Sequence, residues 1–296
     1  MSKISRKLQM INKSYFVSLP KSWIKNLNLE KNSIIDMIIC DDGTIKLAPK
    51  LEKQEKRIDE IIIQSSRYVA RDIVKYCLSG TEKIIIVSKE DFQGEICKDI
   101  LWFVNHLPNA EIIERDKRRI IVSNFGYKRI PTRKIIQRLL YLICDMFENI
   151  KNNDLAELKT NFDSVRRLYF ILVTHIRTYL RTGIYVSEDK TFTPLEAMDY
   201  RMFCEKIERI GMILRDYEYK KGEFDGFFEK VEEFFIEIMD AFLKKNYERA
   251  CEAWFKRDEL INEAQALITN LECQEKERLK LLVSIIEYGK DMADLI

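Results

Sequence analysis

The sequence has only two histidines, His106 and His175, and it lacks the short motifs that mark common catalytic sites. It has no G-x-x-x-x-G-K-S/T loop, no G-x-G-x-x-G turn, no H-E-x-x-H helix and no G-x-S-x-G elbow. Such motifs place phosphate-binding backbone, metal ligands or an activated serine at fixed spacings. Since all of them are missing, we expect a protein that is not an enzyme.

Long apolar runs are also missing, because no uninterrupted run reaches the roughly 18 residues that a membrane span requires. The opening residues MSKISRKL contain no apolar stretch of the signal-peptide kind. The seven cysteines lie far apart, without a C-x-x-C pair, and most lie in apolar runs. This pattern is typical of reduced core residues in the cytosol. We therefore expect a cytoplasmic protein with no membrane insertion.

The chain has little net charge, +2 from 50 Lys and Arg against 48 Asp and Glu, so its composition indicates no nucleic-acid partner. The distribution of charge is uneven, however. Residues 1–50 carry nine basic and four acidic side chains, a net charge of +5, which leaves −3 for the remainder. The basic side chains are therefore in excess at the N-terminal end.

Residues 5–32 have the most informative pattern. Apolar and polar residues alternate in two short runs, which predicts two strands joined by a polar turn. The apolar residues are Ile4, Leu8, Met10, Tyr15, Val17 and Leu19, and the turn is expected at Lys13 and Ser14. A helix should follow, with Ser18 as a possible cap, Pro20 in its first turn, and Trp23, Ile24 and Leu27 on one face.

Two more strands, residues 33–40 and 44–49, are predicted on either side of a primed turn at Asp42-Gly43. Only about 50 residues make up this N-terminal unit, which is too few to bury a core easily. We therefore expect the unit to dimerise. Residues 50–59 are highly charged and are predicted to be a connector.

Residues 57–125 alternate between strand and helix patterns. The predicted order is a strand at 57–64, a helix at 66–80, a strand at 82–87, a helix at 90–107, and a hairpin of strands at 110–115 and 118–125. This order predicts a compact α/β unit, for which a ferredoxin-like arrangement is one candidate.

Beyond Pro131 the pattern is helical, with predicted helices at 131–151, 154–182, 194–218, 224–245, 247–271 and 273–295. Two groups of three are indicated, because Asn152 with Ala156 and Asn246 with Ala250 share a spacing where each group's second helix begins. Helices of this length with short connections should pack as antiparallel bundles. The predicted domains are residues 1–50, 51–128, 129–222 and 223–296.

The phrases RKLQ, YFVSLPKSWIKNLNLEKNSIIDMII and DDGTIKLAP make the N-terminal stretch resemble a SpoVT/AbrB-type DNA-binding domain. The resemblance implies that two chains interleave their hairpins to close one small β-barrel, and that basic side chains on one surface contact DNA. The positions carried over are Arg6, Lys7, Lys13 and Lys25. The family's other basic helix position is Ile24 here, and Lys21 is an extra basic residue on the same turn. Arg6 is the expected base reader, because its guanidinium can pair with guanine through two hydrogen bonds.

The helical part, residues 131–296, resembles PhoU, a phosphate-uptake regulator built from two three-helix repeats. The phrases VRRLYFILV (165–173), KIERIG (206–211) and SIIEYGKDMADLI (284–296) support this resemblance. From about Arg57 onward the chain resembles archaeal PhoU-like proteins that carry an AbrB-type domain. The expected fold class is therefore multidomain α+β: a swapped-hairpin β-barrel, a small α/β unit and a six-helix body of two PhoU-like repeats.

The PhoU resemblance also implies E-x-x-x-D pairs that bind multinuclear iron or zinc, since this spacing stacks two carboxylates on one helix face. No pair is complete in this sequence. The substituted pairs are Phe162 with Arg166, Glu208 with Met212, Asp258 with Asn262, and Val283 with Glu287. The surviving candidate ligands are Asp163, Glu208, Asp258 and Glu287. A divalent or ferric metal at these acids is the disfavoured alternative, and we predict that they form salt bridges instead, among them one between Arg166 and Glu208.

These observations favour a dimeric DNA-binding transcriptional regulator linked to phosphate uptake or phosphate signalling. The alternative is an adaptor that does not bind DNA, dimerises through its N-terminal domain and docks on a phosphate transporter or sensor kinase. An antitoxin is a third possibility, since some AbrB-type domains belong to antitoxins, but the large helical part argues against it.

Overall fold

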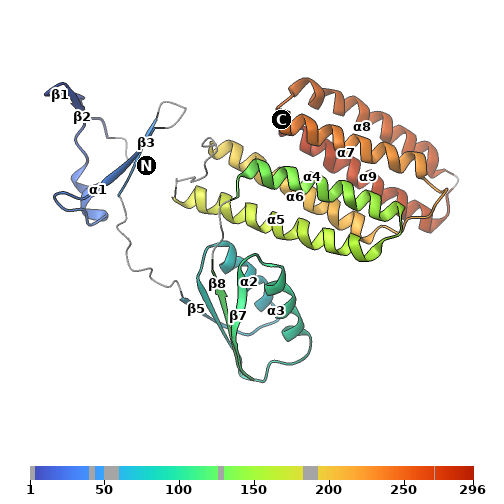
Figure 1. The fold of residues 1–296 in the computed structure, drawn as a ribbon, viewed down its shortest axis with the longest axis horizontal. Coiled ribbons are helices and arrows are strands. Elements are labelled where there is room, and N and C mark those ends of the chain that lie inside the picture. Colours follow the sequence, from blue (N-terminus) through green and yellow to red (C-terminus); the bar gives the residue numbers. More distant parts are fainter. Residues whose placement is uncertain (1–3, 40–43, 50–59, 126–129, 183–192, 270) are drawn as a thin grey trace. The chain divides into compact units, whose positions relative to one another are not determined.

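The computed structural model describes residues 4–39, 44–49, 60–125, 130–182, 193–269 and 271–296 (Figure 1). Contacts within the chain divide it into two compact units, Met1–Arg57 and Ile58–Ile296. We call the described residues of the first unit the head and the second unit the body. The domain boundaries at residues 50, 128 and 222 stay predictions. None of the described helices is long and apolar enough to cross a membrane.

The head contains two hairpins and one short helix (Figure 1). Strand β1 (Gln9–Ile11) pairs antiparallel with β2 (Ser14–Phe16), and β3 (Ile35–Ile39) pairs antiparallel with β4 (Ile45–Pro49). Helix α1 (Lys21–Asn26) follows β2 in the sequence. All of these elements were predicted, although β1 and β2 are shorter than the alternating pattern suggested.

Two local predictions in the head are wrong. The first turn lies at Asn12 and Lys13, whose φ angles of 49° and 67° suit a primed turn, and Ser14 already belongs to β2. Pro20 is the N-cap of α1 and not a first-turn residue, and no side chain caps this helix, so Ser18 has no capping role. The predicted Asp42-Gly43 turn and the connector at residues 50–59 lie outside the described residues.

The head has no core of its own. None of the head residues whose burial is described is buried, and the described strands of one chain form two separate two-stranded sheets, not a closed barrel. Large apolar side chains are instead 41–69% exposed: Ile4, Leu8, Met10, Ile11, Tyr15, Phe16, Val17, Leu27, Ile34, Met37 and Ile45. Isolated two-stranded hairpins are at best marginally stable in water. The strands therefore lack a partner that covers their apolar side chains.

The α/β unit of the body has the predicted order of elements. These are β5 (Glu60–Gln64), α2 (Val69–Leu78), β6 (Lys83–Val87), α3 (Gly94–His106), β7 (Ala110–Arg115) and β8 (Arg119–Asn124). The sheet order is β5-β6-β8-β7. Strands β5 and β6 are parallel neighbours, joined through α2, and the other pairs are antiparallel. The ferredoxin-like arrangement is therefore wrong, because no strand lies between the two strands of the β-α-β unit.

The remaining helices pack as one bundle (Figure 1). They are α4 (Thr132–Lys151), α5 (Leu155–Thr182), α6 (Pro194–Asp216), α7 (Asp225–Lys244), α8 (Tyr247–Ile268) and α9 (Cys273–Ala293). The predicted ranges are confirmed to within a few residues. Helices α4–α6 form one triplet and α7–α9 another, and the triplets are joined by α4 against α7 and α6 against α9.

The two triplets share an internal repeat, and it is most evident where their second helices begin. Asn153 and Lys245 both have positive φ angles, 56° and 51°. The next residues, Asp154 and Asn246, both accept a hydrogen bond from a backbone N–H three residues on. The predicted equivalence of Asn152 with Asn246 is therefore wrong by two positions. The shared asparagine at 152 and 246 was misleading, because the residues that cap the two helices, Asp154 and Asn246, are of different types.

The same shift in numbering, which carries Asp154 onto Asn246, superposes the buried residues of α4 on those of α7. Seven buried positions of α4 correspond to buried positions of α7: Ile135, Ile136, Leu139, Leu142, Ile143, Met146 and Phe147 match Phe227, Phe228, Val231, Phe234, Phe235, Ile238 and Met239. Four phenylalanines of α7, at 227, 228, 234 and 235, are therefore core residues. The repeat is a property of the packing as well as of the sequence.

Gly289 on α9 is a point of close packing between α7 and α9 in the second triplet. A Cβ atom at this position would lie 2.7 Å from Phe234 Cε1 and 2.9 Å from Ile238 Cδ1, both in the core. We expect Gly289→Ala to lower the free energy of unfolding by about 1–3 kcal/mol, because overpacking outweighs the better helix propensity of Ala. Urea denaturation followed by circular dichroism measures the change.

The matched control is Gly226→Ala on α7, where a Cβ atom meets nothing within 4 Å. This substitution should leave the stability unchanged or raise it slightly. Equal effects of the two substitutions would show that helix propensity, and not packing, decides the outcome at Gly289.

All six described cysteines are free thiols. Cys77, Cys97 and Cys204 are buried, as the prediction of core cysteines requires, and burial raises the pKa of Cys77 to about 12. Cys144 and Cys251 are half-buried. The prediction is wrong for Cys273, which is exposed at the start of α9. Cys40 lies outside the described residues.

Candidate nucleic-acid interface

Five basic side chains of the head are the predicted DNA contacts, and all five are exposed. Arg6 and Lys7 precede β1, and Lys13 lies in the turn between β1 and β2. Lys21 and Lys25 lie on α1. Exposed cations of this kind can approach the phosphates of a nucleic acid without any change in the fold.

Helix α1 brings two of these cations together. Lys21 and Lys25 are four residues apart, so they lie on the same face of the helix. Trp23 and Ile24 are half-buried, with Trp23 on the opposite side of the helix and Ile24, three residues after Lys21, at the border of the basic face. Ile24, at the position where the resemblance implies a second basic helix residue, is therefore partly shielded from solvent, and Lys21 supplies a second cation on the exposed face.

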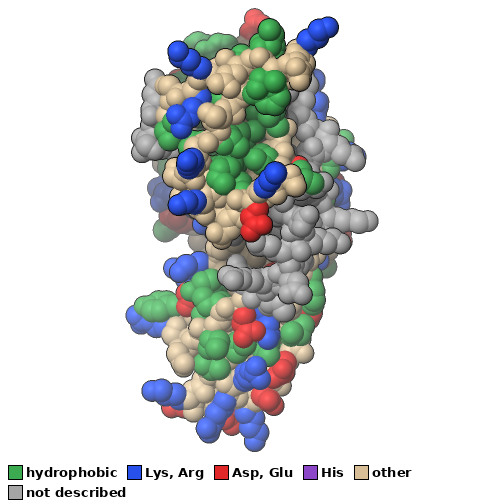
Figure 2. Space-filling model, turned by 90° about the vertical axis from the view of Figure 1, so that its left-hand side faces the viewer, with side chains coloured by type: hydrophobic (Ala, Val, Ile, Leu, Met, Phe, Trp, Pro, Cys, Tyr) green, Lys and Arg blue, Asp and Glu red, His purple; other side chains and the backbone are tan. Residues whose placement is uncertain are grey.

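The surface of the head is basic and apolar at once. In the upper part of Figure 2, where the head lies, hydrophobic side chains gather in the middle of the face and Lys and Arg side chains surround them. Within the described residues, none of the five predicted contacts forms an ion pair with an acid. Their positive charges are therefore available to a ligand. No described contact joins Arg6 and Lys7 to Lys13 or to α1.

The four candidate metal ligands are each paired with a basic side chain. His106 Nε2 lies 3.1 Å from Asp163 Oδ1, and Arg166 Nη2 lies 3.3 Å from Glu208 Oε1. The second pair confirms the predicted Arg166–Glu208 salt bridge. Arg257 on α8 binds both Asp258, at 2.7 Å, and Glu287 on α9.

These pairings do not fit a metal centre. Within the described residues, no three His, Cys, Asp or Glu side chains come together in a way that could hold a metal ion. The guanidinium of Arg166 also lies over the rings of Phe162 and Trp102, at 4.8 and 4.9 Å from their centroids. A metal ion would have to displace cations that already neutralise the carboxylates, so the donor set favours salt bridges over coordination.

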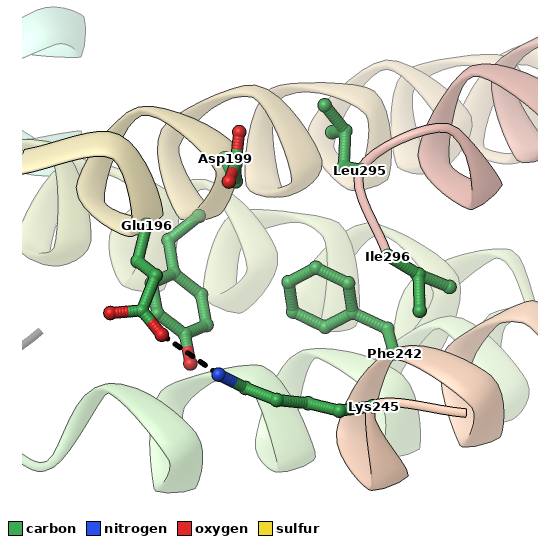
Figure 3. A pocket seen from close by; sticks show the side chains of 7 residues that line it. Glu196, Asp199, Phe242, Lys245, Leu295 and Ile296 are labelled. Carbon is green, nitrogen blue, oxygen red and sulfur yellow. Dashed lines mark hydrogen bonds and ion pairs between the residues drawn. The ribbon is translucent and has the colours of Figure 1, made fainter. Parts of the chain in front are cut away.

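A pocket in the bundle was not predicted. It has a volume of about 140 Å³ and is lined by Glu196, Asp199, Tyr200, Phe242, Lys245, Leu295 and Ile296 (Figure 3). Lys245 Nζ lies 2.8 Å from Glu196 Oε1 at the edge of this group of residues (Figure 3). This hydrogen bond, followed by the one from the Thr193 backbone, lowers the pKa of Glu196. Desolvation, followed by the charge of Glu196, raises the pKa of Asp199.

The pocket lies where the two triplets meet, since Glu196 is in the first turn of α6 and Lys245 ends α7. Residues Thr193–Glu196 have the sequence T-P-x-E and form a complete capping box at the start of α6. This motif could have predicted from the sequence that the Glu196 side chain turns back toward Thr193. Its partner Lys245 is distant in sequence, so no local pattern could have identified the pair.

Comparison with known proteins gives one match. A family model described as antidote-toxin recognition MazE, bacterial antitoxin, matches residues 8–55. This stretch contains β1 to β4, and the match supports an N-terminal DNA-binding domain of the AbrB/SpoVT-like kind. No curated protein and no solved structure matches the chain. The PhoU resemblance of residues 131–296 gains no support from these comparisons.

Proposed function

We propose that this chain is a DNA-binding transcriptional regulator that acts as a dimer formed through its head. The observation that carries the proposal is the joint exposure of apolar strand residues and cations in one small unit. Apolar strand residues such as Met10 and Tyr15 are 68% and 69% exposed, and five basic side chains on the same unit are free of acidic partners among the described residues. The matched family model, residues 8–55, covers the strand residues and Lys13, Lys21 and Lys25, while Arg6 and Lys7 lie just before it.

Dimerisation accounts for the apolar side chains. One chain supplies two short antiparallel hairpins, and a second copy supplies two more. Interleaving the hairpins would close the small barrel and bury residues that are exposed in the single chain, which stabilises the head by roughly 25 cal/mol for each Å² of apolar surface removed from water. The dimer would also present each DNA-binding side chain twice.

DNA binding accounts for the cations. Lys7, Lys13, Lys21 and Lys25 would neutralise phosphates and release counterions, which gives affinity that falls as salt rises. Arg6 has the planar guanidinium that pairs with guanine O6 and N7, so it is the residue proposed to read a base. The proposed function requires no catalysis.

The body is proposed to link DNA binding to phosphate uptake or phosphate signalling. What supports this is the internal repeat of two helical triplets together with the resemblance to PhoU. In the alternative adaptor role, the body docks on a phosphate transporter or sensor kinase and the head only dimerises. Affinity purification of the chain from cells grown at high and low phosphate separates the two roles, because the regulator requires enriched DNA and the adaptor a membrane-complex partner.

An antitoxin-like role is the second candidate, and the description of the matched family favours it. An antitoxin would also bind DNA through the same residues. It differs in requiring a toxin that the chain neutralises. Co-expression with the product of a neighbouring gene, scored by restored growth, distinguishes an antitoxin from a regulator that acts without a toxin.

The test of DNA binding is fluorescence anisotropy with duplex DNA across a salt series. Arg6→Ala/Lys25→Ala should bind about tenfold more weakly at physiological salt, and the dependence of log K on log salt should be shallower by about one for each phosphate that is no longer neutralised. The control is Arg133→Ala/Lys134→Ala, which removes the same charges from two exposed positions at the start of α4. Unchanged affinity and an unchanged salt slope in the head variant would rule out DNA binding by this surface.

A further inference from the structure

The first triplet holds the α/β unit through the outer face of α5, which packs against α2 and α3. Asp163 lies 3.1 Å from His106, and Arg167 Nη2 donates a 3.4 Å hydrogen bond to the carbonyl of Asn105. The guanidinium of Arg166 lies over the ring of Trp102, and Phe170 packs against the apolar core of the α/β unit. This face of α5 is therefore a docking surface that is occupied within the chain.

The second triplet has an equivalent face on α8, and nothing described in the chain covers it. The shift in numbering that relates the triplets carries Asp163, Arg166, Arg167 and Phe170 onto Phe255, Asp258, Glu259 and Asn262, all four of which are exposed. Helix α8 packs on α7 and α9, and it lies on the other side of the bundle from the α/β unit (Figure 1). Phe255 is 74% exposed.

The exposed face of α8 combines aromatic and acidic residues. Glu248, Glu252, Phe255 and Glu259 are separated by four, three and four residues, so they form one strip along the helix. Tyr247, which is 73% exposed, borders the strip at its start. We call these five residues the α8 strip. Single exposed apolar residues are common on protein surfaces, so the distinguishing property of the strip is that two exposed aromatic rings lie beside three exposed glutamates.

The strip keeps its negative charge because the nearby cations form ion pairs with acids on other helices. Arg249 binds Asp240 and Lys256 binds Glu237, both on α7, while Arg257 binds Glu287 on α9. In the part of the chain that the structure describes, no cation forms an ion pair with Glu248, Glu252 or Glu259. Their charges are therefore available to a partner.

We propose that the α8 strip binds a basic amphipathic helix of a partner protein. An apolar stripe on that helix would cover Phe255 and Tyr247, and Lys or Arg residues beside the stripe would pair with the three glutamates. A second copy of α8 is a poor occupant, because it would bring acids against acids. The α5 face shows the same kind of contact within the chain, with two helices of the α/β unit packed on it. The strip lies on the body and does not depend on DNA binding by the head.

The test uses the full chain and three synthetic helical peptides of equal length that carry a fluorescent label. One is amphipathic and basic, built from Leu and Lys; one is amphipathic and acidic, built from Leu and Glu; one is basic without an apolar stripe, built from Ala and Lys. Anisotropy should show binding of the first peptide alone, weakening as salt rises. The emission of Trp254, which borders the strip and is 50% exposed, should change on binding.

The variant Phe255→Ala/Glu252→Gln/Glu259→Gln should bind the basic amphipathic peptide at least tenfold more weakly. The control variant Tyr141→Ala/Glu229→Gln/Glu277→Gln replaces one exposed aromatic residue and two exposed glutamates at body positions outside α8 and should bind like wild type. Equal affinities of the two variants, or no binding of the basic amphipathic peptide by the wild-type chain, would overturn the proposal. Self-association abolished by Phe255→Ala would also overturn it, in favour of a second copy as the occupant.

Discussion

A chain carrying Met10→Lys and Tyr15→Glu is expected to be monomeric and to bind duplex DNA about a hundredfold more weakly than wild type. Met10 and Tyr15 are cross-strand partners in the first hairpin, 68% and 69% exposed. The two substitutions replace an apolar pair with a Lys–Glu pair, which preserves the hairpin through cross-strand attraction and leaves the net charge unchanged. DNA affinity therefore falls because two linked binding surfaces become one.

Sedimentation velocity measures the first effect, since the chain has a mass of 35.3 kDa and a dimer twice that. Anisotropy measures the second. The control is Tyr141→Glu/Leu155→Lys, which changes two apolar residues of the bundle that are 61% and 64% exposed. This variant should keep wild-type mass and affinity. A dimer that survives the head substitutions and binds DNA normally would exclude dimerisation through these strands.

The largest loss of stability is expected from Arg278→Met. Arg278 on α9 is 8% exposed and Glu223, between α6 and α7, is 14% exposed. Two hydrogen bonds join the guanidinium to Glu223 Oε1 at 2.7 and 2.9 Å, and a third reaches Oε2 at 2.6 Å. Removing one partner leaves the other charge buried and unpaired, which lowers the free energy of unfolding by about 3–5 kcal/mol.

Chemical denaturation of the body, followed by circular dichroism at the helix band, measures this loss. Lys280→Met provides the control, because Lys280 is paired with Glu277 at 2.6 Å but both side chains are more than half exposed. Its removal should leave the stability nearly unchanged. The double variant Glu223→Leu/Arg278→Met should recover part of the loss, since no unpaired charge then remains. A single variant as stable as wild type would show that water reaches Glu223.

The helices and strands were predictable because their apolar spacing is local. The six predicted helix ranges agree with α4 to α9, and the order of the α/β unit is confirmed. Pairing between distant strands was not predictable, because nothing in the residues of β5 and β6 says that they are parallel neighbours. The repeat was found but misaligned, since its two capping residues, Asp154 and Asn246, differ in type.

The candidate site was predictable to a similar degree. The basic residues of the head were identified from the motif, and the half-buried position of Ile24 explains why it departs from the basic pattern. Of the salt bridges to the four degenerate acids, only Arg166–Glu208 was identified. Others join elements that are remote in sequence, such as Asp163 with His106. The α8 strip was missed because an exposed phenylalanine and a buried one look alike in a helical pattern.

The lack of a core in the head has a consequence for how its activity depends on abundance. If a second copy completes the barrel, the folding free energy of the head includes the concentration of the chain itself, and each tenfold dilution removes about 1.4 kcal/mol per dimer. The body buries its own core within one chain, so its folding does not require a second copy. At low expression the cell would hold folded bodies with incomplete heads, so DNA occupancy would rise more steeply than protein level and give the regulator a threshold.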